Sequence, residues 1–92
     1  MSGAANFFSG SGVVIEDCSV DERGMASFPW ALGEGGADNL PMIVWVVTAG
    51  ARVPMVQRVA KKGRRVAVWG RLTALQGGDV GVFMDWFHLI QQ

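Results

Sequence analysis

One segment of this 92-residue chain carries nearly all of its positive charge, and its side chains could bind phosphate groups. Seven of the eight Lys and Arg residues lie between positions 52 and 71. In a chain whose formal net charge is zero, such a concentration predicts a surface for a polyanion. The alternative is ordinary solvated surface without a ligand. The candidate phosphate contacts are Arg52, Lys61, Lys62, Arg64, Arg65 and Arg71.

Flat side chains are the second requirement for binding a nucleic-acid strand without regard to its sequence, because bases stack on them. Strand alternation sorts the four tryptophans by the face on which each one lies. Trp30 shares its face with Phe28 and is predicted to be buried. Trp45 is the preferred stacking residue, with burial as the open alternative. Trp69 and Trp86 are predicted to face either nucleic acid or a neighbouring subunit, since an interface would also protect an exposed ring.

Composition limits the kind of protein that can carry these side chains. Half of the residues are hydrophobic, which is enough for one core and more than a small monomer readily hides. Self-association as a homodimer or homotetramer is therefore expected. The single cysteine, Cys18, excludes a disulfide framework within the chain and fits a reducing compartment. Without an 18-residue apolar run or a signal peptide, the expected location is the cytoplasm, with the nucleoid or a viral replication site as alternatives.

The elements that must position these side chains are predicted to be mostly strands. Short apolar runs are separated by Gly, Asn, Asp and Pro, and the predicted strands cover residues 7–15, 25–32, 42–48, 65–75 and 80–90. The apolar period changes after Pro54, which predicts one helix of about two turns near residues 55–60. This order predicts an all-β, five-stranded OB-fold barrel with a short helix between strands 3 and 4. It forms a single domain over residues 1–92, in which residues 1–5 are expected to be disordered.

Several short patterns occur in this same order. An apolar strand at residues 43–47 precedes the helix, and Lys62-Gly63, alternating Val66 and Val68, and Gly70-Arg71-Leu72 follow it. The last strand carries Asp85 before Phe87, Leu89 and Ile90, while residues 6–10 and 24–28 fit more loosely as the first two strands. With these patterns the chain resembles the bacterial single-stranded DNA-binding protein family over nearly its whole length. The resemblance implies non-enzymatic binding and protection of single-stranded DNA in replication, recombination or repair. It also implies self-association, and a binding surface on the third-strand face that carries Trp45.

The chain departs from the family pattern at the stacking positions. Where the family carries loop and strand aromatics, this sequence has Gly35 or Gly36, Ile43, Ala49 and Gly77. The connection between the last two strands is reduced to a tight turn at residues 76–79, and the acidic C-terminal tail of bacterial members is expected to be absent. These departures leave two interpretations open. One is a minimal, divergent member; the other is an OB-fold subunit of a primosome-like replication or RNA-processing assembly with weak nucleic-acid affinity.

Catalytic and metal chemistry find little support in the sequence. The one histidine, His88, has no Cys or carboxylate at a metal-ligand spacing and no identifiable nucleophile. No phosphate-binding loop follows a predicted strand. The chain is therefore expected not to be an enzyme and to need no cofactor or metal. The basic segment and Trp45 are predicted to form one groove, for which DNA and RNA remain alternative ligands.

Overall fold

The computed structural model of the protein describes residues 7–32 and 42–91. The predicted disorder of residues 1–5 and the glycines at positions 35 and 36 lie outside these described residues. The strands are β1 (Phe7–Val14), β2 (Ser19–Val20), β3 (Ala26–Leu32), β4 (Met42–Thr48), β5 (Arg65–Ala74) and β6 (Val80–Gln91). A 3-10 turn at Gly50–Arg52 runs directly into helix α1 (Val53–Val59), and a second 3-10 turn at Gln76–Gly78 joins β5 to β6.

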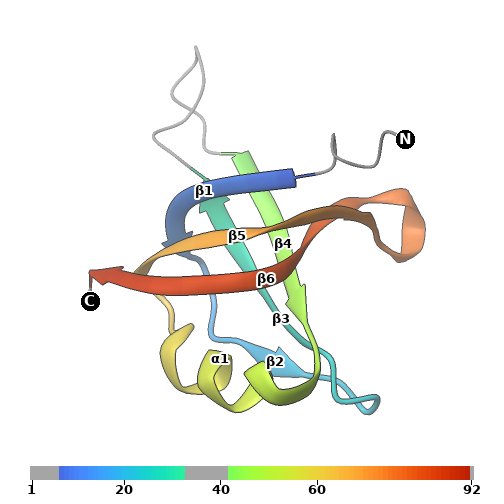
Figure 1. Ribbon diagram of the computed structural model, residues 1–92, viewed down its shortest axis with the longest axis horizontal. Coiled ribbons are helices and arrows are strands. Elements are labelled where there is room, and N and C mark those ends of the chain that lie inside the picture. The colour runs from blue at the N-terminus through green and yellow to red at the C-terminus, as the bar shows by residue number, and fades with distance from the viewer. Residues whose placement is uncertain (1–6, 33–41, 92) are drawn as a thin grey trace.

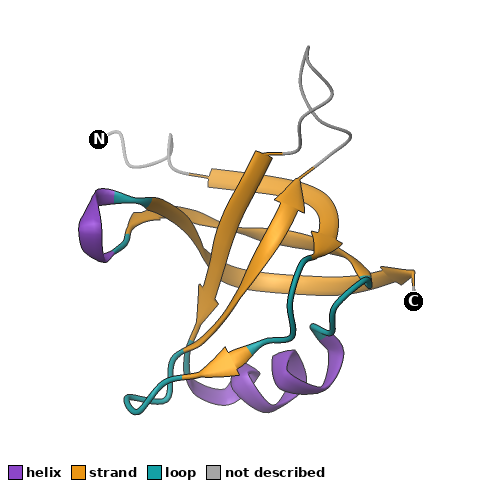
Figure 2. Cartoon of the chain, turned by 180° about the vertical axis from the view of Figure 1, so that it is seen from behind, coloured by secondary structure: helices purple, strands orange, loops and turns teal. Residues whose placement is uncertain are grey.

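The strands close into a barrel in the order β1-β5-β6-β4-β3, because β1 also pairs with β3. Only β4 and β6 run parallel among these pairs, and the other neighbours are antiparallel. Figure 1 shows the long β5–β6 hairpin crossing the barrel, with α1 beneath one end. Figure 2 shows the molecule from behind, where α1 and the 3-10 turn of the β5–β6 hairpin lie well apart. The predicted OB-fold is confirmed.

Two details of the predicted fold need correction. The two-residue strand β2 pairs with β3, so the helix falls between β4 and β5 rather than between the third and fourth strands. The helical segment also starts at Gly50, before Pro54, and ends at Val59. Pro54 does lie in the first turn of α1, as its missing N–H favours. No helix in the described part of the chain is long and apolar enough to cross a membrane.

Alternating side chains fill the barrel. Trp30 and Phe28 are buried, as predicted, and Phe8 contacts the Trp30 ring edge-on with 6.1 Å between ring centroids. Helix α1 closes one end of the core through Val56. The remaining buried core side chains are Val14, Val46, Ala60, Val66, Val68, Val82, Met84 and Phe87.

A β-bulge in the β5–β6 hairpin decides which side chains point outward. Trp69 pairs with Trp86, but the next residue, Gly70, pairs with Met84, so Asp85 has no residue opposite it. Met84 is buried, whereas Asp85 and Trp86 are both exposed. Gly70 permits this close approach, because a Cβ there would lie 2.2 Å from the carbonyl oxygen of Phe83. The bulge thus brings a carboxylate and an indole ring side by side onto the outer surface.

Candidate nucleic-acid interface

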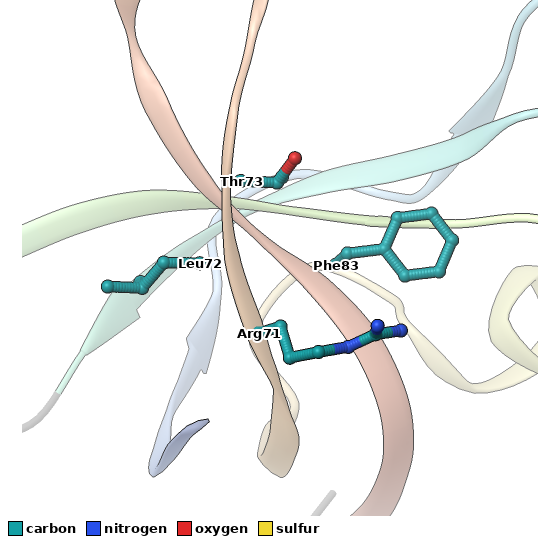
Figure 3. Close-up of a pocket in the computed structure, with 4 residues that line it drawn as sticks. All are labelled: Arg71, Leu72, Thr73 and Phe83. Atoms are coloured by element: carbon teal, nitrogen blue, oxygen red, sulfur yellow. The ribbon is translucent and has the colours of Figure 1, made fainter. Parts of the chain in front are cut away.

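Two adjoining hollows lie beside the outer end of the β5–β6 hairpin. The first has a volume of about 340 Å³ and is lined by Arg71, Leu72, Thr73 and Phe83. The second, of about 290 Å³, shares Thr73 and Phe83 and extends to Val47 and to Arg23 in the turn before β3. We refer to the two hollows together as the groove. Figure 3 shows Arg71 and Phe83 extending in the same direction from neighbouring strands.

Strand register explains why these side chains share one face. Val47 of β4 lies opposite Phe83 of β6, which lies opposite Arg71 of β5. Residues opposite one another in a sheet point to the same side, and here that side is the outside of the barrel. In the next cross-strand row, Trp45 lies opposite Gly81, which lies opposite Thr73. The indole of Trp45 therefore borders the groove.

Trp45 is accessible to a ligand, with 41% of its surface exposed. Its neighbour Gly81 has no side chain, and the Leu75 methyl groups lie where a Cβ of Gly81 would be, within 2.9 and 3.2 Å. Gly81 and Leu75 therefore contribute no polar or charged side chain to the surface beside Trp45. Such a surface suits the face of a nucleobase.

Arg71 combines a cation with an aromatic ring. Its guanidinium carbon lies 5.9 Å from the centre of the Phe83 ring. One guanidinium nitrogen, Nη2, donates a hydrogen bond of 3.1 Å to Oδ1 of Asp85. More than half of the Arg71 side chain remains exposed. The guanidinium can therefore contact a phosphate from solvent while it remains over the ring.

A second cation–aromatic pair lies further along the same outer face. Trp69 and Trp86 are opposite one another on β5 and β6, and both are exposed, at 36% and 53%. The guanidinium carbon of Arg52, at the end of the 3-10 turn before α1, lies 5.7 Å from the centre of the Trp86 ring. The predicted outward orientation of Trp69 and Trp86 is confirmed.

The rest of the basic segment lies at the other end of β5. Arg64 donates hydrogen bonds to the carbonyl oxygens of Arg58 and Val59, at 3.3 and 3.2 Å, and so caps the end of α1. The backbone N–H of Lys62 donates to Oδ1 of Asp17 at 2.8 Å, and the side chains of Lys61 and Lys62 are exposed. Arg65 begins β5 opposite Gln91.

The length of β5 separates the basic residues at its start from the Trp45 face. Arg65 is eight residues before Thr73, the β5 residue in the cross-strand row of Trp45. At ~3.3 Å per residue the two positions are roughly 26 Å apart along the strand. The structure therefore brings Arg71 next to the Trp45 face and Arg52 next to Trp86. It places Lys61, Lys62, Arg64 and Arg65 toward the start of β5, away from the Trp45 face.

Sequence reasoning missed two residues of the groove. Phe83 alternates with the buried Val82 and Met84, and this alternation is the signal that could have placed it outward. Arg23 lies far from the basic segment in sequence, and only folding brings it to the groove. It forms an ion pair of 3.7 Å with Asp21. Backbone hydrogen bonds from Met25 and Arg23 lower the pKa of Asp21, so this carboxylate holds the turn.

Other reactive groups lie outside the groove. Cys18 is half-buried, and desolvation raises the pKa of its thiol, which leaves little thiolate at neutral pH. His88 is exposed opposite Ala67. Within residues 7–32 and 42–91, no three His, Cys, Asp or Glu side chains are grouped to hold a metal ion.

Comparison with known proteins gives matches of structure and none of sequence. No protein-family model matches the chain, and no curated protein matches it. Among solved structures, a small single-stranded DNA-binding protein from Streptomyces coelicolor is similar, with a TM-score of 0.77 and 14% identity over 91% of each chain. The second single-stranded DNA-binding protein of Mycobacterium smegmatis gives 0.70 and 18%, over 91% of this chain and 87% of that one. The SSB domain of a Synechococcus sp. protein gives 0.68 and 19%, over 90% and 93%.

These comparisons show that the chain has the fold of single-stranded DNA-binding domains. The similarity covers nearly the whole chain, as the sequence patterns predicted. At such low identity the comparison concerns the path of the backbone.

Proposed function

We propose that this chain, built on the fold of single-stranded DNA-binding domains, binds single-stranded DNA without sequence specificity and without catalysis. The observation that carries the proposal is that two arginines lie over exposed or half-exposed rings at cation–π distance, Arg71 over Phe83 and Arg52 over Trp86. Each pair offers a cation for a phosphate beside an apolar surface for a base. Trp45 adds a further exposed ring at the edge of the groove.

The spacing of the two pairs supports a single continuous ligand. Because of the bulge, Phe83 and Trp86 lie opposite Arg71 and Trp69, which are two residues apart on β5, about 7 Å at the rise of a strand. OB-folds bind about 4–16 nucleotides, so one strand is long enough to contact both pairs and Trp45. Phosphates on that strand would meet Arg71 and Arg52, and Arg23 where the strand enters the second hollow.

The cellular role proposed is the protection of exposed single strands during replication, recombination or repair, in the cytoplasm, the nucleoid or a viral replication site. Such a role needs affinity for any base, which ring faces provide because every base can stack. No side chain in the proposed contact set is required to read a base edge. The role accordingly needs neither a cofactor nor a metal.

Self-association is proposed from the outer edge of β1. Among the described residues, β1 pairs with β3 only over Gly12–Val14, so the opposite edge of residues 7–11 has no strand partner. Phe7, at the start of this edge, is 66% exposed. An unpaired edge beside an exposed aromatic ring suits pairing with a second copy of the chain. Sedimentation equilibrium would give the mass of the assembly, and a monomer at all concentrations would contradict this part of the proposal.

The test of the function is the quenching of tryptophan fluorescence by poly(dT), measured at several salt concentrations with duplex DNA as the control. Quenching by the single strand alone is expected. Two to three arginine contacts predict a plot of log affinity against log salt with a slope of about −1.4 to −2.1. Absence of binding even at low salt would reject the proposal and favour the OB-fold protein-interaction subunit. A parallel titration with poly(U) compares RNA with DNA.

A further inference from the structure

We infer that Asp85 acts as an internal substitute for phosphate on Arg71 and thereby limits the affinity of this face for nucleic acid. The inference rests on the proposed function, since it concerns the same arginine. In the free protein the guanidinium of Arg71 is paired with the Asp85 carboxylate, at 3.1 Å. A phosphate that binds Arg71 competes with that carboxylate for the single positive charge of the guanidinium, although other N–H donors of the group are open to solvent.

The β-bulge places the carboxylate inside the binding face. Asp85 has no residue opposite it on β5 and lies between Phe83 and Trp86, the two rings of the cation–aromatic pairs. About half of the Asp85 side chain is exposed, so its charge meets any anion that approaches either ring. A strand spanning both rings would carry its phosphates past this carboxylate, and like charges at short range repel.

The contacts of Asp85 differ from those of the other acid at the groove. The carboxylate of Asp21 accepts hydrogen bonds from the backbone N–H groups of Arg23 and Met25, and so maintains its turn. No backbone N–H in the described part of the chain donates to the Asp85 carboxylate, which is held by the Arg71 side chain. An ion pair between two half-exposed side chains stabilises a fold only slightly. Asp85 is therefore dispensable for the fold while it opposes the ligand.

Two arrangements of Arg71 follow. In one, its guanidinium donates to Asp85; in the other, it donates to a phosphate, and Asp85 becomes an unpaired carboxylate that attracts a cation from solution. That cation uptake offsets part of the counterion release that drives binding. The native protein is thus expected to bind less tightly, and with a weaker salt dependence, than its arginines alone would give.

The variant Asp85→Asn tests the inference, because it keeps the size of the side chain and removes its charge. Affinity for poly(dT) at low salt should rise about threefold to fivefold. The salt slope should become steeper by up to about 0.7, the contribution of one phosphate contact. Glu16→Gln is the matched control, because it removes the same charge from an exposed side chain that follows the last residue of β1, Val14.

A double-variant comparison separates this inference from the proposed function. Arg71→Gln alone should weaken binding, and adding Asp85→Asn to it should raise the affinity by less than Asp85→Asn does in the native chain, because only the direct repulsion is then removed. The competition inference is wrong if Asp85→Asn raises the affinity for poly(dT) no more than Glu16→Gln does. It is also wrong if Asp85→Asn raises the affinity equally in the native chain and in Arg71→Gln. If Arg71→Gln binds normally, the contact on which the proposed function depends is wrong instead.

If the native chain fails to bind, tight binding by Asp85→Asn still supports the inference, and failure of both proteins rejects both ideas. Thermal unfolding of every variant confirms that each one is folded.

Discussion

The two ends of strand β5 differ in what their cations do. At the start of the strand, Arg64 caps helix α1 and the backbone of Lys62 is bonded to Asp17, with exposed lysine side chains nearby. At the other end, Arg71 lies over the ring of Phe83. The first end has more positive charge and the second has the rings. Cation density in the sequence and the combination of cation with ring therefore identify different places in the molecule.

The difference matters because the two kinds of contact have different ranges. Charge attraction between exposed groups extends over a Debye length of ~8 Å at physiological salt and ~30 Å at 0.01 M. Stacking acts only at contact, and contributes about 1–3 kcal/mol per base. On the proposed function, a strand is therefore expected to be attracted by the lysine-rich end when salt is low, and to be held mainly at the aromatic end when salt is high.

Removal of the exposed ring at the groove is the change expected to have the largest effect. Trp45→Ala should weaken binding of poly(dT) about fivefold to 150-fold, which corresponds to the loss of one stacked base. Fluorescence anisotropy of a labelled oligonucleotide measures this without relying on tryptophan emission. Ile90→Ala, which truncates an exposed apolar residue toward the other end of β6, is the matched control. Equal effects of the two variants would remove the distinction between the ends.

Arg71→Gln is the next largest change expected. Loss of one phosphate contact should weaken binding several-fold at low salt and make the salt slope less steep by about 0.7. Stability should change by no more than about 1 kcal/mol, because the pair with Asp85 is exposed. Arg65→Gln removes the same charge from the start of β5 and should leave the slope nearly unchanged. A larger change in slope for Arg65→Gln would move the phosphate path to the lysine-rich end.

Arg64→Gln should have the opposite signature, affecting the fold rather than the ligand. The guanidinium bonds to two carbonyl oxygens at the end of α1, so its loss should reduce the free energy of unfolding by about 1 kcal/mol. For a domain of this size that lowers Tm by about 4–8 °C. Arg58→Gln, exposed on the same helix, controls for the charge. Weakened DNA binding in a protein of unchanged Tm would show that Arg64 contacts the strand directly.

Most of the fold could be predicted from the sequence because apolar and polar residues alternate along most of its strands. Val66 and Val68 face inward and Trp69 outward, as the period of two requires. The β-bulge at Asp85 could not be predicted, because it depends on the close approach of Gly70 to the β6 backbone. Similarly, β2 has only two residues, too few to give a pattern.

The candidate site could be predicted only in part. Outward tryptophans follow from alternation, so Trp69 and Trp86 were correctly predicted to face outward. For Trp45 the sequence left burial open, and the structure shows the residue exposed. Grouping the cations by their nearness in sequence was less informative, because β5 is ten residues long and cations at its start lie far from those near its other end. Arg23 is brought to the groove by tertiary contacts that leave no local signal. The association of particular cations with particular rings thus had to come from the structure.

The smallest effect is expected from the lysines themselves. In Lys61→Gln/Lys62→Gln two exposed charges are lost next to the start of β5, roughly 26 Å along the strand from the row of Trp45. That separation is about three Debye lengths at 0.15 M salt, so the affinity should change less than about twofold. At 0.01 M salt the Debye length exceeds the separation, and the association rate measured by stopped flow should fall several-fold. A loss of affinity at 0.15 M as large as that of Arg71→Gln would mean that the strand contacts both ends of β5. A rate independent of the lysines at low salt would mean that they attract no DNA at all.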